Sequence, residues 1–589
     1  MTSLAASARS RLVKRDIWAL VALLAIAVVL PTVVGAISGS LDMPRNDDWS
    51  YRGIALHLFE TGRLELDGAA ATMLVGQIVV AQPFLWLSGG ATWGLTTVGV
   101  LSAVIAIVAG YLLVRRLVTP GRAALAMLIL PLFPGFLPYA ASFMTDLPAI
   151  AAEFVCLGLG IVALRGGRIR GRWLLASLAV GVFGFTVREF SLAAPASVLA
   201  AAVLVQPRRL RPWLSGFAVV AVCVAIYYVR SRLPNQTGVT VHPISDYSSD
   251  RVARAVSSLA FVLLPAAVVA AATWWRRWRL PDVAVGALLG SYLVHQRIID
   301  LVATGVVPPV LLDNLATQWG TPIQYMTFGS RPVLFSDIAW SAINGLALIA
   351  TIVLVAVGAG VFGFHVRRAL RAPRSIPARL ASPAGIVLMF SAATAMGLIV
   401  FGMIGTIFDR YLWPLVPTLA SLMLMRPLGQ QRGVDFRESV VDEVDGQRSG
   451  VARPIGVIPA VTAAALILLL GGMGLSLMLN SAAFDPARWS AAERLVDLGV
   501  PAESIDAGIE WVGYHATSPM EYAHPVPAAT WWEALWPSFR LCGFVATTPQ
   551  NLPGARLVEV DLHAYRLLLF AGQDETLYLY RVEGPQCER

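Results

Sequence analysis

Long apolar segments alternate with short polar ones along most of the sequence. An α-helix rises 1.5 Å per residue, so about 20 apolar residues cross the ~30 Å hydrocarbon layer of a bilayer. We predict thirteen such membrane helices, the first of which is too long to be a cleaved signal peptide. The predicted helices lie near residues 17–38, 93–114, 121–141, 146–164, 173–188, 190–206, 213–229, 256–274, 282–302, 337–362, 383–407, 411–426 and 455–479.

Arginines gather in every second loop between these segments, and the intervening loops carry far fewer. Because positively charged loops stay in the cytoplasm, this pattern predicts a cytoplasmic N-terminus in a multi-pass plasma (inner) membrane protein. Thirteen crossings then place the C-terminus outside the cell membrane. The arginine-rich loops contain Arg9–Arg15, Arg115, Arg116, Arg122, Arg165–Arg172, Arg208–Arg211, Arg276–Arg279 and Arg367–Arg379.

Three stretches lie outside the predicted membrane helices. Within the membrane module (1–479), residues 39–92 form a long first outer loop with interfacial helices, and the polar residues 427–454 form a disordered cytoplasmic loop. Residues 480–589 form an extracytoplasmic domain. The predicted fold is therefore a polytopic α-helical membrane protein with a small C-terminal α/β domain.

The C-terminal domain carries its own pattern of elements. We expect a helix over 487–498, a strand over 504–514 and a hairpin formed by 564–572 and 576–583. The aromatic residues of this domain are expected in its core or at the membrane surface, although stacking on an acceptor sugar is an alternative. These residues are Trp511, Tyr514, Trp531, Trp532 and Trp536.

The composition excludes several classes of protein. Hydrophobic residues make up 57% of the chain and charged residues 14%, against about 45–50% and about 25% in soluble domains. A soluble enzyme and a disordered protein are thereby excluded. The net charge of +9 resides in the short loop clusters rather than in one patch, which excludes a nucleic-acid partner and leaves membrane lipids as the surroundings.

The four cysteines divide between membrane and outer domain. Cys156 and Cys223 fall within predicted membrane helices, where they pack. Cys542 and Cys587 lie in the extracytoplasmic domain, where oxidising conditions favour a disulfide between them; two free thiols are the alternative. No spacing of Cys and His resembles a zinc site, so neither metal nor cofactor is expected.

Four polar motifs fall on the outer side of the predicted membrane module. Asp47 and Asp48 open an amphipathic helix in the first outer loop. One of them is either the N-cap of that helix or a general base at the membrane surface. Asp146 stands at an outer helix end in the sequence TDLP, where Thr145, Asp146 and Pro148 also make an ordinary helix start.

The remaining two motifs contain arginine on the side where the charge bias disfavours it. Arg188 and Glu189 interrupt an apolar run and form either a self-neutralising pair or a site for an anionic partner. Asp409, Arg410 and Tyr411 form an outer turn, for which simple solvation is the alternative. Because the four motifs share one membrane face, we expect them to surround a cavity if the helices bundle.

The motifs NDDWSY, LVGQ, FMTDLP, VREFSL and DRYLWPLVP occur in this order along the chain. This series resembles that of GT-C-fold membrane glycosyltransferases of the protein O-mannosyltransferase superfamily, including the aminoarabinose transferase of lipid A and family-39-like bacterial enzymes. The resemblance covers roughly residues 15–425 and implies a GT-C-like fold.

The resemblance assigns roles to individual residues. It implies that Asp47 is the catalytic base, with Asp48 a close second, and that Tyr51, Asp146, Glu189 and Tyr411 support the site. Two positions depart from the lipid A enzyme: Ser50 replaces a basic residue, and its phosphate-binding Lys has no equivalent. Phosphate binding is therefore assigned to arginine, first Arg188 and then Arg410 or Arg52.

The resemblance also implies an activity. A sugar would pass from a polyprenyl-phosphate donor to an extracytoplasmic glycan, lipid or protein by an inverting displacement, without a cofactor. The alternatives are a transporter or flippase of a lipid-linked glycan and a catalytically inactive scaffold. Convergence of Asp47, Asp146 and Arg188 on one site would favour the enzyme.

Overall fold

The computed structural model describes residues 2–236, 246–312, 318, 328, 334–404, 407–425, 456–521, 532, 535–566 and 574–587. The predicted cytoplasmic loop at 427–454, Trp531 and the turn of the predicted C-terminal hairpin lie outside the described residues.

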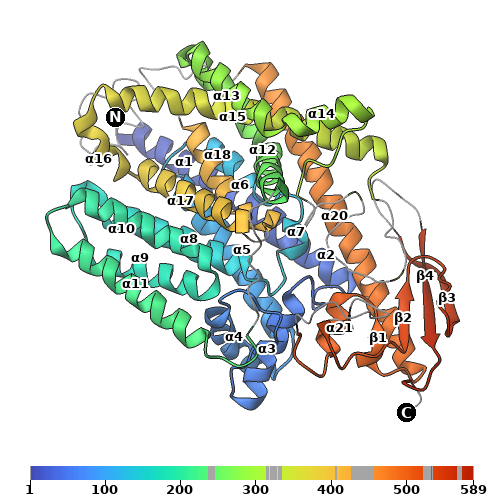
Figure 1. Cartoon of the computed structure of the whole chain (residues 1–589). Helices are drawn as coiled ribbons and strands as arrows, with labels where there is room; N and C mark the ends of the chain where they lie inside the picture. The colour runs from blue at the N-terminus through green and yellow to red at the C-terminus, as the bar shows by residue number, and fades with distance from the viewer. Residues whose placement is uncertain are drawn as a thin grey trace.

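The membrane module is helical throughout its described part, with its helices stacked side by side (Figure 1). Its elements are α1 (Thr2–Leu24), η1 (Ala25–Val29), α2 (Leu30–Ser38), α3 (Asp48–Thr61), α4 (Val75–Ser88), α5 (Trp93–Val114), α6 (Pro120–Leu128), α7 (Phe136–Tyr139), α8 (Asp146–Ala163), η2 (Arg165–Gly167), α9 (Gly171–Val187), η3 (Glu189–Leu192), α10 (Ala193–Val205), α11 (Leu210–Arg230), α12 (Asp246–Trp274), η4 (Trp275–Arg277), α13 (Leu280–Leu293), α14 (His295–Thr304), α15 (Asp337–Leu370), η5 (Pro373–Ser375), α16 (Ile376–Leu380), α17 (Pro383–Ile404), η6 (Asp409–Leu412), α18 (Leu415–Leu424) and α20 (Val457–Asp497).

Eight helical segments of the described chain are long and apolar enough to cross a membrane, and each matches one of the thirteen predicted helices. The predicted class, a polytopic helical membrane protein, is confirmed. The eight segments are Val13–Ser38, Trp93–Val114, Asp146–Ala163, Leu210–Arg230, Ser249–Arg277, Asp337–Leu370, Pro383–Met403 and Val457–Asp497.

Two of the other five predicted helices are interrupted, so their prediction as single spans is wrong; the remaining three are present as short apolar helices at the predicted places. The segment 121–141 breaks after Leu128 because Pro131 and Pro134 lack a backbone N–H and Gly135 is left-handed. Within the segment 282–302, the helix α13 ends at Leu293, and the N–H of Val294 donates a hydrogen bond to the carbonyl of Tyr292. Residues 173–188, 190–206 and 411–426 correspond to the shorter helices α9, α10 and α18.

The helices differ in how far the protein itself covers them. In α8, which packs between α5 and α9, 78% of the most apolar stretch is buried, whereas in α11 only 17% is buried. The apolar side chains of α11 therefore face outward, as expected for a helix that contacts lipid. The helix α8 lies in the centre of this part of the module, and its first residue is Asp146.

One helix, α20, joins the membrane module to the C-terminal domain without a break (Figure 1). It has 41 residues and is about 60 Å long at 1.5 Å per residue. The sequence pattern predicted two helices here, at 455–479 and 487–498, and that separation is wrong. Since the helix continues through residue 480 and through Pro486, no loop separates the two parts at this point of the chain.

The C-terminal domain is a small α/β unit, as predicted. Its sheet has the order β1-β2-β4-β3, in which β1 (Ile505–Asp506) runs parallel to β2 (Gly543–Ala546). The strands β3 (Ala555–Arg566) and β4 (Asp574–Val582) form an antiparallel hairpin, and β4 also pairs with β2. The predicted second strand, 576–583, matches β4, whereas the first strand begins at Ala555, before the predicted start at 564. The last turns of α20 pack on this sheet.

The predicted strand over 504–514 is wrong beyond its first residues. It ends after Asp506, whose Oδ1 accepts a hydrogen bond from the N–H of Gly508. Gly508 has a φ of 95°, a value that strongly favours glycine. Along the chain, η7 (Ala502–Ser504) precedes β1, and α21 (Ile509–His515) follows Gly508. The apolar residues that suggested alternation pack instead in two separate clusters, Trp511 in one and Ile509 and Val512 in the other.

The structure joins Cys542 and Cys587 in a disulfide with Cα atoms 5.5 Å apart. The bond closes a loop with a sequence separation of 45, which restricts the unfolded chain. We expect Cys542→Ser to lower the free energy of unfolding of this domain by about 2–4 kcal/mol. Thermal unfolding of the purified protein with and without reductant checks this: reductant should lower the melting temperature of the wild type and leave that of Cys542→Ser where it is. Equal melting temperatures of the wild type and Cys542→Ser without reductant would contradict the prediction.

Candidate active site

The two adjacent aspartates of the first outer loop differ in exposure at the start of α3. Asp47 occupies the N-cap position, but its side chain makes no capping hydrogen bond and is 44% exposed. The side chain of Asp48 is fully buried and accepts a hydrogen bond of 2.8 Å from Nε of Arg52. Capping therefore does not explain Asp47, and Asp48 belongs to a buried ion pair.

Asp47 begins a row of alternating charges that extends into the protein. Its Oδ2 accepts a hydrogen bond of 2.6 Å from Nη2 of Arg410, and Nε of Arg410 lies 3.6 Å from Oδ2 of Asp146. The Oδ1 of Asp146 contacts Nη1 of Arg188. We call these four residues the Asp–Arg row. Its three inner members are buried, and only Asp47 reaches solvent.

Each inner member comes from a different element. Asp146 is the first residue of α8, and Arg188 follows the last residue of α9. Arg410 lies in η6 after α17. The structure thus brings together Asp47, Asp146 and Arg188, the convergence that the sequence hypothesis requires. Burial of Asp409 and Arg410 also rules out a simple solvated turn.

Aromatic side chains hold the two arginines. The guanidinium carbon of Arg188 lies 4.2 Å from the centroid of the Tyr411 ring, and the guanidinium carbon of Arg410 lies 5.7 Å from the same centroid. The ring of Phe408 lies 5.0 Å from the guanidinium carbon of Arg410. Such cation–π contacts stabilise a cation by about 0.5–2 kcal/mol. Tyr411 therefore supports the site by positioning Arg188 and Arg410.

Tyr51 lies one helical turn after Asp47 and is buried beside the row. Burial and the nearby charge of Asp47 raise the pKa of the Tyr51 phenol above its ordinary value, and Arg410 and Arg188 offset only part of this rise. The phenol consequently stays protonated at neutral pH. It offers a neutral O–H group next to the carboxylate of Asp47.

The arginines of the row retain unused hydrogen-bond donors. Nε of Arg188 and Nη1 of Arg410 are buried and have no hydrogen-bond partner among the residues that the structure describes. A buried donor without a partner costs about 1–3 kcal/mol, so an acceptor oxygen at this point would be stabilising. Guanidinium groups suit phosphate oxygens, which they bind through two N–H groups at once.

Arg52, one of the residues assigned to phosphate binding, lies apart from the Asp–Arg row. The donors of Arg52 go to Asp48, to the carbonyl of Asp42 and to the hydroxyl of Thr96, and the side chain is fully buried. Arg52 therefore stabilises α3 against its neighbours rather than joining Arg188 and Arg410. Glu189 begins η3 next to Arg188, but Arg188 contacts Asp146.

Sequence reasoning missed a second buried charge layer, which links this site to the C-terminal domain. Arg45 pairs with Asp485 at 3.1 Å, and Arg488 pairs with Glu510 at 3.0 Å. The Oε1 of Glu510 also accepts a hydrogen bond of 3.3 Å from the backbone N–H of Asn46. Its signal in the sequence was Asp485 and Arg488, three residues apart in a helical segment directly after the apolar stretch 457–479.

This layer fixes the residue that precedes Asp47. Asn46 is buried and has a φ of 56°, a conformation that L-residues other than Asn and Asp rarely adopt. Burial raises the pKa of Glu510, and the charge of Arg488 opposes that rise. The C-terminal domain thereby holds the backbone turn from which Asp47 projects.

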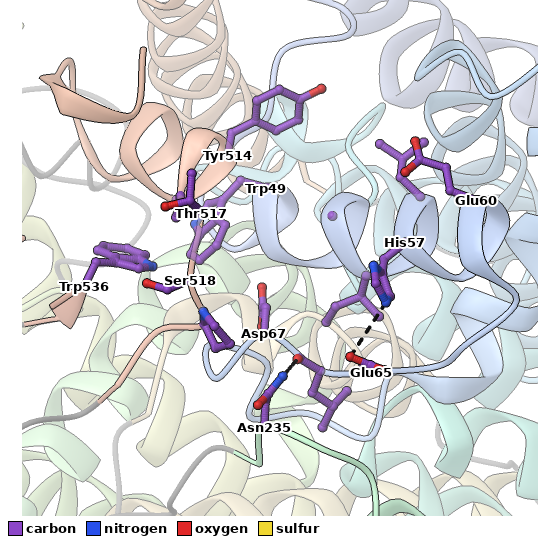
Figure 2. A pocket seen from close by; sticks show the side chains of 17 residues that line it. Trp49, His57, Glu60, Glu65, Asp67, Asn235, Tyr514, Thr517, Ser518 and Trp536 are labelled. Atoms are coloured by element: carbon purple, nitrogen blue, oxygen red, sulfur yellow. Dashed lines mark hydrogen bonds and ion pairs between the residues drawn. The ribbon is translucent and has the colours of Figure 1, made fainter. Parts of the chain in front are cut away.

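A large cavity lies between α3 and the C-terminal domain, apart from the Asp–Arg row (Figure 2). Its volume is about 570 Å³, and its walls come from α3, the loop after it, Asn235 and residues 513–519 with Trp536. In the described part of the chain no group of three or more His, Cys, Asp or Glu side chains is placed to hold a metal ion.

Comparison with known proteins gives one family match and several distant structural likenesses. The family described as dolichyl-phosphate-mannose-protein mannosyltransferase matches residues 79–230, from α4 to the end of α11. This match includes Asp146 and Arg188, and it confirms the resemblance to membrane glycosyltransferases predicted from the motifs. No curated protein matches the chain.

Two solved structures illustrate the likenesses. A crystal structure of ArnT from Cupriavidus metallidurans bound to undecaprenyl phosphate is 14% identical, with 95% of this chain and 98% of that chain covered and a TM-score of 0.41. The archaeal oligosaccharyltransferase AglB from Archaeoglobus fulgidus, in complex with an inhibitory peptide and a dolichol-phosphate, is 14% identical. That comparison covers 89% of this chain and 63% of the other, with a TM-score of 0.38.

Proposed function

We propose that the protein is a GT-C-type membrane glycosyltransferase that transfers a sugar from a polyprenyl-phosphate donor to an extracytoplasmic acceptor. The observation that carries this proposal is the Asp–Arg row: an exposed carboxylate at one end and two buried guanidinium groups with unused donors behind it. A base and a phosphate site are the two parts that such a transfer requires. The family match, to enzymes named for a dolichyl-phosphate sugar, agrees with this pairing.

The geometry of the row supports an inverting displacement. Asp47 accepts the proton of an acceptor hydroxyl as that oxygen forms a bond to the anomeric carbon of the donor sugar. The bond between this carbon and the phosphate oxygen breaks, and polyprenyl phosphate leaves with the electron pair. Arg188 and Arg410 stabilise the charge on the departing phosphate. A single displacement of this kind inverts the configuration at the anomeric carbon.

The topology completes the proposal. The Asp–Arg row lies at the end of the module that contacts the C-terminal domain, because Asn46, next to Asp47, is bound by Glu510. The loops rich in arginine favour a cytoplasmic N-terminus, and the disulfide suits an oxidising compartment. We infer that the row and the domain both lie outside the plasma membrane, where lipid-linked sugars are presented.

Convergence of the charged motifs favours an enzyme over a transporter. A transporter or flippase carries its ionisable groups near the middle of the membrane. Here Asp47 lies before the first residue of α3, Asp146 begins α8, and Arg188 follows the end of α9. An inactive scaffold has no need for an exposed carboxylate held against a buried arginine.

A panel of radiolabelled polyprenyl-phosphate sugars tests the proposal. The purified protein is incubated with each donor and with membrane extract as the source of glycan, lipid and protein acceptors. We expect transfer from one donor, and we expect it to persist in EDTA because arginines meet the phosphate charge. Failure to transfer from any lipid-linked donor, or transfer from a nucleotide sugar instead, would contradict the proposal.

A further inference from the structure

The cavity between α3 and the C-terminal domain extends around α3 beyond the side that carries Asp47. At 3.6 residues per turn, Tyr51 projects about 40° around the helix from Asp47. Gly53, His57 and Glu60, which line the cavity, project about 220–280° around it, and Ile54, which also lines it, projects about 340°. The cavity thus borders α3 mostly on the side away from Asp47 and reaches round to the side of Asp47 at Ile54.

The chemistry of the cavity is opposite to that of the row. Glu60, Glu65 and Asp67 contribute carboxylates, with His57 3.7 Å from Glu65, and neither Arg nor Lys is among its lining residues (Figure 2). Such a cavity disfavours phosphate and other anions. Carboxylates accept hydrogen bonds from sugar hydroxyls.

The far wall supplies hydroxyl groups and aromatic rings. Tyr514, Thr517 and Ser518 line the cavity from the C-terminal domain; Tyr514 is partly exposed, and Oγ of Ser518 shares a hydrogen bond of 2.7 Å with Oγ of Ser538. Trp49 and Trp536, with ring centroids 5.7 Å apart, form the base. A concave site with apolar rings and a few polar groups that converge is typical of ligand binding, and a volume near 570 Å³ lies in the usual range.

We propose that this cavity is a distal acceptor subsite that binds an uncharged oligosaccharide. The inference rests on the proposed function, and it specifies the acceptor as a glycan. The cavity begins at Trp49, two residues after Asp47, and reaches Glu60, thirteen residues after it, so it extends from about 3 Å to about 20 Å from Asp47 along α3. A single sugar does not fill this length, so the acceptor is a chain whose end reacts at Asp47 and whose remote sugars occupy the cavity.

Other acceptors fit the cavity less well. A peptide bound by strand addition needs an exposed sheet edge, and none of the lining residues belongs to a strand. An anionic glycolipid or phospholipid meets three carboxylates and, among the described lining residues, neither arginine nor lysine, and the imidazole of His57 lies 3.7 Å from Glu65. Hydroxyl-rich, uncharged ligands remain the class that the lining groups match.

Gly53 offers a test that removes no existing contact. It lies within α3, and a Cβ atom at this position would meet no heavy atom within 4 Å. Gly53→Trp therefore fills the cavity while the helix is kept, because glycine is the weaker helix former. The matched control is Gly397→Trp in α17, where a Cβ atom likewise meets nothing within 4 Å.

The measurement is calorimetric binding to the purified full-length protein, without donor. The probes are uncharged mannan, arabinan and galactan oligosaccharides, acidic and neutral peptides, and vesicles with anionic lipid. We expect at least one oligosaccharide to bind the wild type and Gly397→Trp alike, to bind Asp47→Asn as well, and to bind Gly53→Trp at least tenfold more weakly than the wild type. Melting temperatures confirm that all four proteins are folded.

Three results would overturn the inference: no oligosaccharide binds, Gly53→Trp binds as tightly as the wild type, or only a peptide or a vesicle binds. Failure of the proposed function shows itself differently, as a lack of transfer from every lipid-linked donor. Since binding is measured without donor and also in Asp47→Asn, the two failures are distinguishable.

Discussion

Asp47→Asn is expected to reduce sugar transfer by about 10²–10⁴-fold, the usual contribution of a general base. The amide keeps the size of the side chain and still offers an oxygen to Nη2 of Arg410, but it does not take up the proton of the acceptor hydroxyl. Because Asp47 is 44% exposed and makes no capping hydrogen bond, its replacement should leave the fold intact. Initial rates at saturating donor and acceptor measure the loss.

Two further carboxylates serve as comparisons for this variant. Asp497→Asn changes an exposed carboxylate at the end of α20 and should transfer sugar at the wild-type rate. Asp48→Asn removes one partner of a fully buried ion pair, which typically costs about 3–5 kcal/mol of stability, so its first effect should be a lower melting temperature. If the folded Asp47→Asn protein retained full activity, Asp47 would not be the general base.

Arg188→Gln and Arg410→Gln are each expected to lower kcat/KM for the donor by about 10²–10³-fold. Removing one donor that stabilises charge on a reacting oxygen has effects of this size. Arg188→Lys and Arg410→Lys should recover only part of the activity. Lysine keeps the positive charge, but it lacks the planar group that binds phosphate through two N–H donors and stacks on the ring of Tyr411.

Steady-state kinetics with varied donor concentration measure these effects. Arg208→Gln, in an exposed position between α10 and α11, is the control for the loss of one basic residue and should show wild-type kinetics. Arg52→Gln should mainly lower the melting temperature, because the donors of Arg52 bind Asp48 and its neighbours. Unchanged donor kinetics in both Arg188→Gln and Arg410→Gln would exclude the row as the phosphate site.

The two adjacent aspartates show where prediction from the sequence stops. The motif containing Asp47 and Asp48 identified the right corner of the molecule, but nothing in it indicates which carboxylate meets solvent. The structure decides this through residues far away: Arg410, 363 positions later, binds Asp47, and the packing of α3 encloses Asp48 with Arg52. Similarly, Arg52 is a secondary candidate for phosphate binding in the sequence, but in the structure its donors bind Asp48, Asp42 and Thr96.

The sequence by itself determined the class of the protein, the positions of eight spanning helices, the disulfide partners and the motifs that contribute to the site. These properties follow from the length and apolarity of local segments and from residue chemistry, both of which are readable in order along the chain. The tertiary structure alone decided the order of the Asp–Arg row, the continuity of α20, the binding of Asn46 by Glu510 and the cavity behind α3. Each of these depends on which faces of distant helices meet, and packing between segments hundreds of residues apart leaves no local pattern in the sequence.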